Sequence, residues 1–227
     1  MPSLVFEITG VVPAPRSLSP LLHFALRITN LPPDETIQAV LLSTQIHIQP
    51  AQRAYTPAEQ EKLVELFGPP EMWGQTLRNR LWTHTNATVG TFQGSTEPLL
   101  PAPCTADLSD TAAKYFYALE DGDVPLLFLF SGSVFYTNAG RLQVGPISWN
   151  QECVFRMPVR VWQSLMEHHN PNSSWVPLRR DTYERLYAHR RRHSLMTWEE
   201  TIDHLLQTRS PSLESVLPEP KREHVAA

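Results

Sequence analysis

Apolar residues alternate with polar ones along much of the chain before Pro158, and they recur at helical spacing after it. Residues 22–29 and 40–48 each place apolar side chains on every second position, which predicts two half-buried strands. Because no crossover helix separates these segments, we expect them to pair antiparallel. The pattern predicts an α+β fold, with a mainly antiparallel β-sheet or sandwich body, one inserted helix and a helical C-terminal third.

The inserted helix begins at a clear capping sequence. Thr56 can accept hydrogen bonds from the free N–H groups, Pro57 suits the first turn, and Glu59 completes a capping box. Gly68 follows the last apolar position and is typical of a helix end.

Two later segments predict further elements of the body. Residues 110–119 are ambiguous, since Asp110 suits an N-cap while three consecutive aromatic residues favour a strand; we expect a helix. Residues 124–136 form a continuous apolar run and predict a central strand, in which Gly132 marks a bulge or a close approach of two backbones.

The chain beyond Pro158 predicts helices over about residues 159–206. Asp181 is expected to cap one of them, and Thr197 with Glu200 forms a second capping box. We therefore expect a single β-rich domain over residues 1–207. Residues 208–227 are rich in proline, serine and charge, which predicts a disordered tail.

Composition and charge exclude several classes of protein. The net charge of −4 argues against nucleic-acid binding, and the basic cluster 190–192, flanked by His189 and His193, is interpreted as a solvated helix face. The longest apolar run, 124–130, is too short for a membrane helix, and the N-terminus does not resemble a signal peptide. We expect a cytoplasmic protein in which Cys104 and Cys153 are free thiols.

Few residues suggest chemistry. The sequence has no glycine-rich phosphate loop and no metalloprotease or paired-cysteine motif. The adjacent His168 and His169 point about 100° apart on a helix, so they do not form a two-ligand face. No ligand spacing in the sequence supports a zinc site built from Cys104, Cys153, His84 and His169, so such a site would form only if the fold happened to bring these residues together. We expect no catalytic residue, no metal and no cofactor.

Six tryptophans are many for 227 residues, and two of them lie beside predicted loops. Large aromatic residues mostly fill cores, but tryptophan is also enriched at protein interfaces. Trp82 and Trp149 are therefore the candidate protein-binding residues. The position of Trp82 within a strand favours the core, whereas the setting of Trp149 favours an interface.

Several short segments together carry a family resemblance. They are Phe67-Gly68, Trp73-Gly74, Thr76-Leu77, Leu81 to His84, Pro103 to Thr105, Ala113 to Phe116, Leu129 to Gly132, and Pro171 to Ser173 with Trp175. Over about residues 4–206 the chain resembles a bacterial family, a domain of unknown function, whose genes are often found beside nickel–iron hydrogenase subunits. The resemblance implies a gene that neighbours hydrogenase genes and a hydrogenase subunit as the partner. It implies no catalytic mechanism.

A weaker resemblance is to the SecB-type export chaperone. Residues 124–136 look like that family's strand ending in a glycine-containing turn. The C-terminal end is similar in its order of elements, which is Glu152-Cys153, a helix, the loop Trp175 to Leu178 and the helix 181–192. The inserted helix and the additional N-terminal strands depart from that family.

These observations predict a non-catalytic accessory or scaffold protein that binds another protein during assembly of a hydrogenase or related redox enzyme. The alternatives are a SecB-like chaperone for unfolded chains and an enzyme whose site is not visible in sequence. A concave pocket holding a histidine or carboxylate with a strongly shifted pKa would favour an enzyme. An apolar patch without such a group would favour binding.

Overall fold

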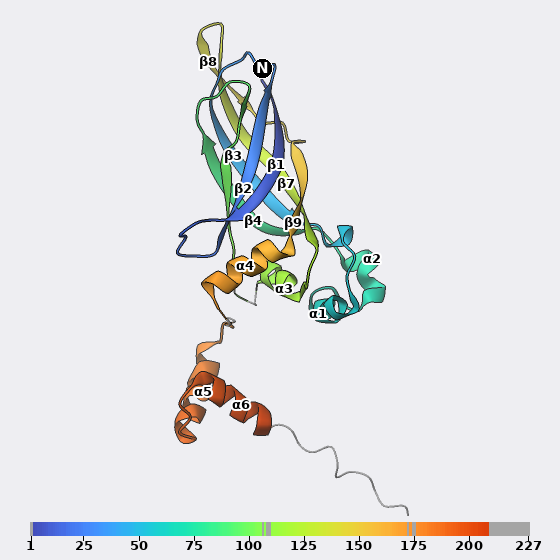
Figure 1. The fold of residues 1–227 in the computed structure, drawn as a ribbon, viewed down its shortest axis with the longest axis vertical. Coiled ribbons are helices and arrows are strands. Elements are labelled where there is room, and N and C mark those ends of the chain that lie inside the picture. Colours follow the sequence, from blue (N-terminus) through green and yellow to red (C-terminus); the bar gives the residue numbers. More distant parts are fainter. Residues whose placement is uncertain (1, 106, 108–109, 172, 174–175, 209–227) are drawn as a thin grey trace, which may run out of the picture. The chain divides into compact units, whose positions relative to one another are not determined.

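The computed structural model describes residues 2–105, 107, 110–171, 173 and 176–208 (Figure 1). By its internal contacts the chain divides into two compact units, Met1–Val176 (unit 1) and Pro177–Ala227 (unit 2). The single domain predicted over 1–207 stays a prediction. Residues 209–227 of the predicted tail lie outside the described residues, as does Trp175.

The first sheet of unit 1 is antiparallel and is built on β2 (Leu21–Leu31). On one side β2 pairs with β1 (Ser3–Pro13), and on the other with the short strands β5 (Ser95–Thr96) and β6 (Leu99–Pro103). Every second side chain of β2 from Leu22 to Asn30 is buried, so the predicted alternation is confirmed.

The second sheet is antiparallel as well, and β7 is its longest strand. The order is β4 (Arg80–Val89), β3 (Ile37–Ile48) and β7 (Asp123–Asn138). The other edge of β7 is shared by β8 (Arg141–Pro146) and β9 (Glu152–Pro158). The expected combination of helices with antiparallel sheets is thus confirmed.

Gly132 lies on β7 opposite Leu42 of β3, where the two backbones leave no room for a side chain. Its φ is +135°, and a Cβ placed on it would lie 2.0 Å from the carbonyl oxygen of Leu41. Only glycine fits such a position, since any other side chain would collide with backbone. The predicted close approach at Gly132 is confirmed.

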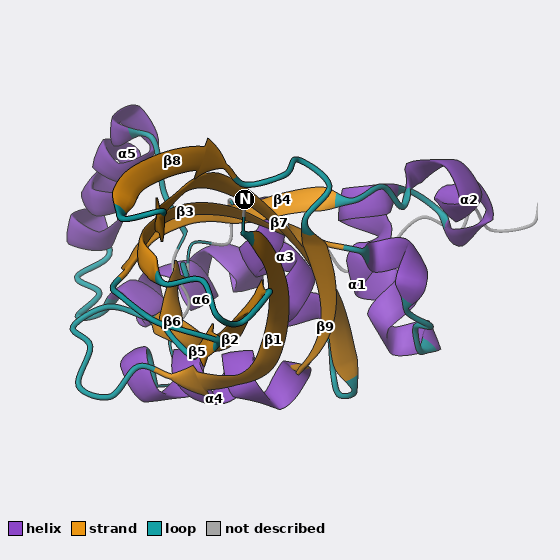
Figure 2. Cartoon of the chain, turned by 90° about the horizontal axis from the view of Figure 1, so that it is seen from above, coloured by secondary structure: helices purple, strands orange, loops and turns teal. Residues whose placement is uncertain are grey.

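Both sheets are curved, as Figure 2 shows, and the buried side chains of their strands belong to one hydrophobic cluster. Phe6 on β1 stacks on Phe130 of β7 with ring centroids 4.6 Å apart, and Phe24 on β2 meets Phe128 edge-on at 5.1 Å. These aromatic pairs join the two sheets, because each pair takes one ring from either sheet.

Helices gather at one end of the strands (Figure 1). They are η1 (Pro50–Gln52), α1 (Pro57–Phe67), η2 (Pro70–Met72), α2 (Trp73–Thr76), α3 (Thr111–Ala118) and α4 (Val159–His169). The capping box of α1 is confirmed, and so is the helix at 111–118, which Asp110 caps. The prediction of one inserted helix was wrong: α2 and α3 are additional. The aromatic residues of α3 favoured a strand in sequence, but here they pack into the core, where Phe116 stacks on Trp162 of α4 at 5.1 Å.

Unit 2 consists of α5 (Arg180–Arg192) and α6 (Trp198–Thr208). The predicted capping box at Thr197 and Glu200 is confirmed by the hydrogen bond from Glu200 N–H to Thr197 Oγ1, 3.1 Å long. The predicted cap at Asp181 was wrong, because α5 begins at Arg180, so that Asp181 lies within its first turn, and the helix has no side-chain cap. None of the helices in the described part of the chain has both the length and the apolar character that a membrane span requires.

Candidate functional site

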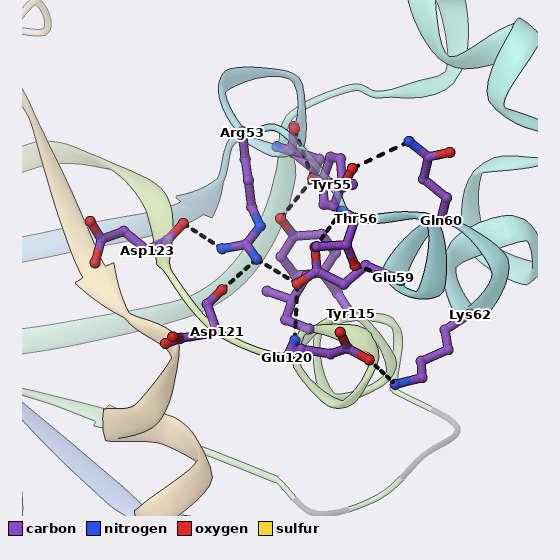
Figure 3. Close-up of polar contacts among 12 residues, drawn as sticks. Arg53, Tyr55, Thr56, Glu59, Gln60, Lys62, Tyr115, Glu120, Asp121 and Asp123 are labelled. Carbon is purple, nitrogen blue, oxygen red and sulfur yellow. Dashed lines mark hydrogen bonds and ion pairs between the residues drawn. The ribbon is translucent and has the colours of Figure 1, made fainter.

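A buried ion pair fixes α1 to the segment that enters β7 (Figure 3). The guanidinium of Arg53 donates to Glu59 Oε1 at 2.6 Å and to the carbonyl oxygens of Asp121 and Asp123 at 2.6 and 2.8 Å. Only 8% of the Arg53 side chain and 2% of the Glu59 side chain are exposed. We call this group the Arg53–Glu59 clamp.

The Glu59 carboxylate accepts further hydrogen bonds from backbone N–H groups. Glu120 N–H donates to Oε1 at 2.9 Å, and Thr56 N–H donates to Oε2 at 3.0 Å. Desolvation by itself would raise the pKa of Glu59, but these N–H groups and Arg53 outweigh it and lower the pKa. A fully partnered, ionised carboxylate of this kind holds structure together and is poorly suited to proton transfer.

Two tyrosines lie beside the Arg53–Glu59 clamp, and the Arg53 guanidinium lies over the ring of one of them, Tyr55. The hydroxyl groups of Tyr55 and Tyr115 share a hydrogen bond 2.8 Å long, and the Tyr55 hydroxyl lies within donating distance of the carbonyl oxygen of Pro50, also at 2.8 Å. Burial raises the pKa of Tyr55 to about 12 and raises that of Tyr115 further. Both phenols are therefore neutral at physiological pH and contribute packing and hydrogen bonds.

A second, chemically different site lies between the start of β1 and the end of β8. It is an apolar pocket of about 610 Å³, which we call the seam pocket. It is lined by Pro2, Ser3, Leu4, Val134, Pro146, Ile147, Ser148, Trp149 and Gln151. Leu4, Val134 and Ile147 form its buried wall, whereas 93% of Trp149 is exposed.

Backbone hydrogen bonds anchor the connection that carries Trp149. Ile147 N–H donates to Gly132 O at 2.9 Å, and Phe130 N–H donates to Gln151 O at 2.9 Å, so both flanks of the connection are tied to β7. The exposed indole therefore projects from a connection that is held at both ends. In the described chain, no other aromatic ring stacks on Trp149.

The nine residues that line the seam pocket include no titratable side chain. The pocket can therefore take up an apolar group and offer a few hydrogen bonds from serine, glutamine and backbone, but it supplies no general acid or base. Its chemistry suits binding.

Trp82, the other candidate from the sequence, lies elsewhere. It is the additional residue of β4 at a bulge, since Thr83 pairs with Ile46 and Leu81 with His47. Its partly buried ring contacts Phe24 edge-on at 6.3 Å and Phe116 at 4.9 Å. The structure thus places Trp82 against the core and Trp149 on the surface, and it does not bring them into one site.

The cysteines show no sign of activation. Burial raises the pKa of Cys104 to about 12 and that of Cys153 to about 11, so both thiols are protonated near neutral pH. Within the described residues, no group of three or more histidine, cysteine or acidic side chains is placed to hold a metal ion as it stands. His169 lies close to the carbonyl oxygens of Leu165 and Ser17, at 3.0 and 3.2 Å.

Sequence reasoning missed two groups of residues. Glu59 was interpreted only as a cap, and nothing in the sequence linked it to Arg53. His189, His193 and His204 of unit 2 also approach one another. The pKa of His189 is lowered, mainly by desolvation and to a smaller extent by the charges of the two neighbouring histidines. The four-residue spacing of His189 and His193 was a usable signal, because it places both on one helix face.

Comparison with known proteins gives a family and no close relative. No curated protein matches the chain. The model of one protein family does match, over residues 1–214, and its description is a family of unknown function, DUF6084. Because the match extends through the β body and both units, the chain belongs to the DUF6084 family.

Proposed function

We propose that this protein is a non-catalytic accessory or scaffold protein, and that it binds an extended segment of a partner protein at the seam pocket. The observation that carries the proposal is the nearly fully exposed Trp149 beside an apolar pocket without titratable groups. Exposed tryptophans next to pockets are typical anchors of protein interfaces.

The neighbouring strand supports an extended partner. β8 pairs with β7 along one edge, and the pairings among the described strands leave its other edge open. Leu142 and Val144 lie on one face of β8 and are 64% and 62% exposed, and the stripe they form leads to Pro146 at the pocket. An extended segment can add to such an edge through its backbone while an apolar side chain enters the pocket.

The identity of the partner rests on the family resemblance. Genes of the resembled family often neighbour those of nickel–iron hydrogenase subunits, so we propose a subunit of such an enzyme, or of a related redox enzyme, as the partner during its assembly. We also propose a cytoplasmic location, where the protonated thiols would stay reduced.

The test compares binding by variants of the full-length protein. Trp149→Ala should weaken binding of the purified hydrogenase subunit by about 30- to 1,000-fold, because a tryptophan anchor contributes about 2–4 kcal/mol. Leu18→Ala is the matched control, since Leu18 is fully exposed and does not line the pocket. Equal affinities of Trp149→Ala and the unmodified protein would disprove the proposed site.

A second measurement separates the proposal from a SecB-like chaperone. The same proteins are titrated with a permanently unfolded reporter polypeptide. A scaffold that recognises one partner should bind the folded subunit and leave the reporter unbound. Comparable affinity for the reporter would favour the chaperone, for which the apolar stripe on β8 would serve as a surface for unfolded chains.

A further inference from the structure

Unit 2 has very little core of its own. Among residues 177–207, whose side chains the structure describes, Thr201 is the one buried residue. Tyr183, Tyr187 and Trp198 form an aromatic cluster with ring centroids 5.5–6.3 Å apart, yet both tyrosines are close to half exposed. A helical hairpin this small usually needs a disulfide, a metal ion or a partner to hold it together.

A disulfide cannot supply that link, because both cysteines of the chain, Cys104 and Cys153, belong to unit 1. Three histidines instead converge where the end of α5 faces α6. His189 lies in the last turn of α5, His193 is the C-cap residue that follows this helix, and His204 comes from α6. Their ring centroids lie 4.4, 4.6 and 5.1 Å apart.

The nitrogen atoms of two of these rings already have a suitable separation. His189 Nε2 and His204 Nδ1 are 3.1 Å apart and share a hydrogen bond. In a tetrahedral site with zinc–nitrogen bonds of 2.0–2.1 Å, two ligand nitrogens are separated by ~3.3 Å. Since the three rings are not placed to hold an ion as they stand, binding requires the His189–His204 hydrogen bond to give way and the three imidazoles to reorient around the ion.

We propose that His189, His193 and His204 bind one divalent transition-metal ion, such as zinc, which links α5 to α6. Imidazole nitrogens suit this class of ion, and three of them leave a fourth position for water. Arg190 does not compete for the site, because its guanidinium donates to the carbonyl oxygens of Leu195 and Met196 and lies over the Trp198 ring. This goes beyond the proposed function, and it opposes the expectation from the sequence that no metal is bound.

The test uses full-length protein without a histidine tag, freed of metal by a chelator and titrated with zinc. We expect one equivalent to bind, with a gain in helical circular dichroism as α5 and α6 are fixed together. His193→Gln and His204→Gln should each weaken zinc binding by at least about 100-fold, more than the loss of a residue outside the ligand shell. His168→Gln is the matched control: this exposed histidine lies on α4 in unit 1, and its loss should leave zinc affinity unchanged.

Three results would overturn the proposal. The first is the absence of stoichiometric zinc binding. The second is binding that neither His193→Gln nor His204→Gln weakens, or that His168→Gln weakens instead. The third is binding that leaves the helical signal unchanged, since the ion would then not link the two helices. Replacement of zinc by cobalt gives an independent readout, because a tetrahedral cobalt site with three imidazoles absorbs visible light strongly and an octahedral one does not.

Discussion

The two compact units of this protein are stabilised in different ways. In unit 1, aromatic side chains from both sheets and from α3 and α4 meet in a continuous core, and Trp162 is 1% exposed. In unit 2, most side chains of the two helices are exposed, the apolar Ile202 and Leu206 of α6 among them, and half-exposed aromatic rings and imidazoles make contacts between the helices. The comparison shows that helical periodicity alone does not provide a core. A helix pair that leaves its apolar side chains largely exposed must be tied by other means.

The largest expected difference between the units comes from removing a tryptophan in each. Trp162→Ala should lower the free energy of unfolding by about 3–5 kcal/mol, because it leaves a cavity beside Phe116. Trp198→Ala removes a ring that contacts Tyr183 and Arg190 near the surface. It should change the free energy of the main unfolding transition by less than about 0.5 kcal/mol. Denaturant unfolding followed by near-ultraviolet circular dichroism measures both. Similar losses for the two variants would mean that unit 2 contributes to the same cooperative core.

A backbone substitution tests how closely the strands of unit 1 pack. Gly132→Ala should destabilise the protein by about 3 kcal/mol, since its Cβ would collide with the Leu41 carbonyl oxygen and its φ is positive. Gly140→Ala is the control, because Gly140 also has a positive φ but no atom lies near its Cβ position; about 1 kcal/mol is expected there. Thermal melts of the two variants give the comparison, and equal shifts would contradict the close approach of β3 and β7.

The clamp gives unit 1 a dependence on pH. Glu59→Gln should cost about 2–3 kcal/mol at neutral pH, because Arg53 then stays buried without its counter-charge. Glu61→Gln on the exposed side of the same helix should change little.

The sign of the pH effect follows from the pKa of Glu59, which is lowered from its ordinary value of 4.5. Its contribution is fully present above the pKa of the unfolded state and is lost as pH falls through the folded-state pKa. Unfolding free energies between about pH 7 and pH 3 should therefore decrease less steeply for Glu59→Gln than for the unmodified protein. Parallel curves would show that Glu59 does not titrate with a lowered pKa.

Trp149→Ala is expected to change stability much less than a substitution of a core tryptophan. With 93% of this residue exposed, its removal should change the free energy of unfolding by less than about 0.5 kcal/mol. Trp82→Ala should cost more, about 2–3 kcal/mol, because that ring packs on Phe24 and Phe116. Thermal melts of both variants complete the comparison of a surface tryptophan with one against the core. A large loss of stability in Trp149→Ala would mean that this ring stabilises the fold and is not available to bind a partner.

The sequence alone determined those features that depend on neighbouring residues. The helix that starts at Thr56, the capping box at Thr197 and the alternation of β2 were predictable, because caps and strand periodicity act over a few residues. Gly132 was recognised for the same reason, since the absence of a side chain in a continuous apolar strand is a local signal.

Other features were decided only by the tertiary structure. Whether residues 111–118 form a helix depended on the core that receives their aromatic rings, and the different surroundings of Trp82 and Trp149 depended on which strands flank them. The pairing of Arg53 with Glu59, and of His204 with His189, joins residues whose own neighbours in sequence give no hint of the partner. Local propensity acts within one or two turns, whereas burial and electrostatic pairing are set by the packing of the whole chain.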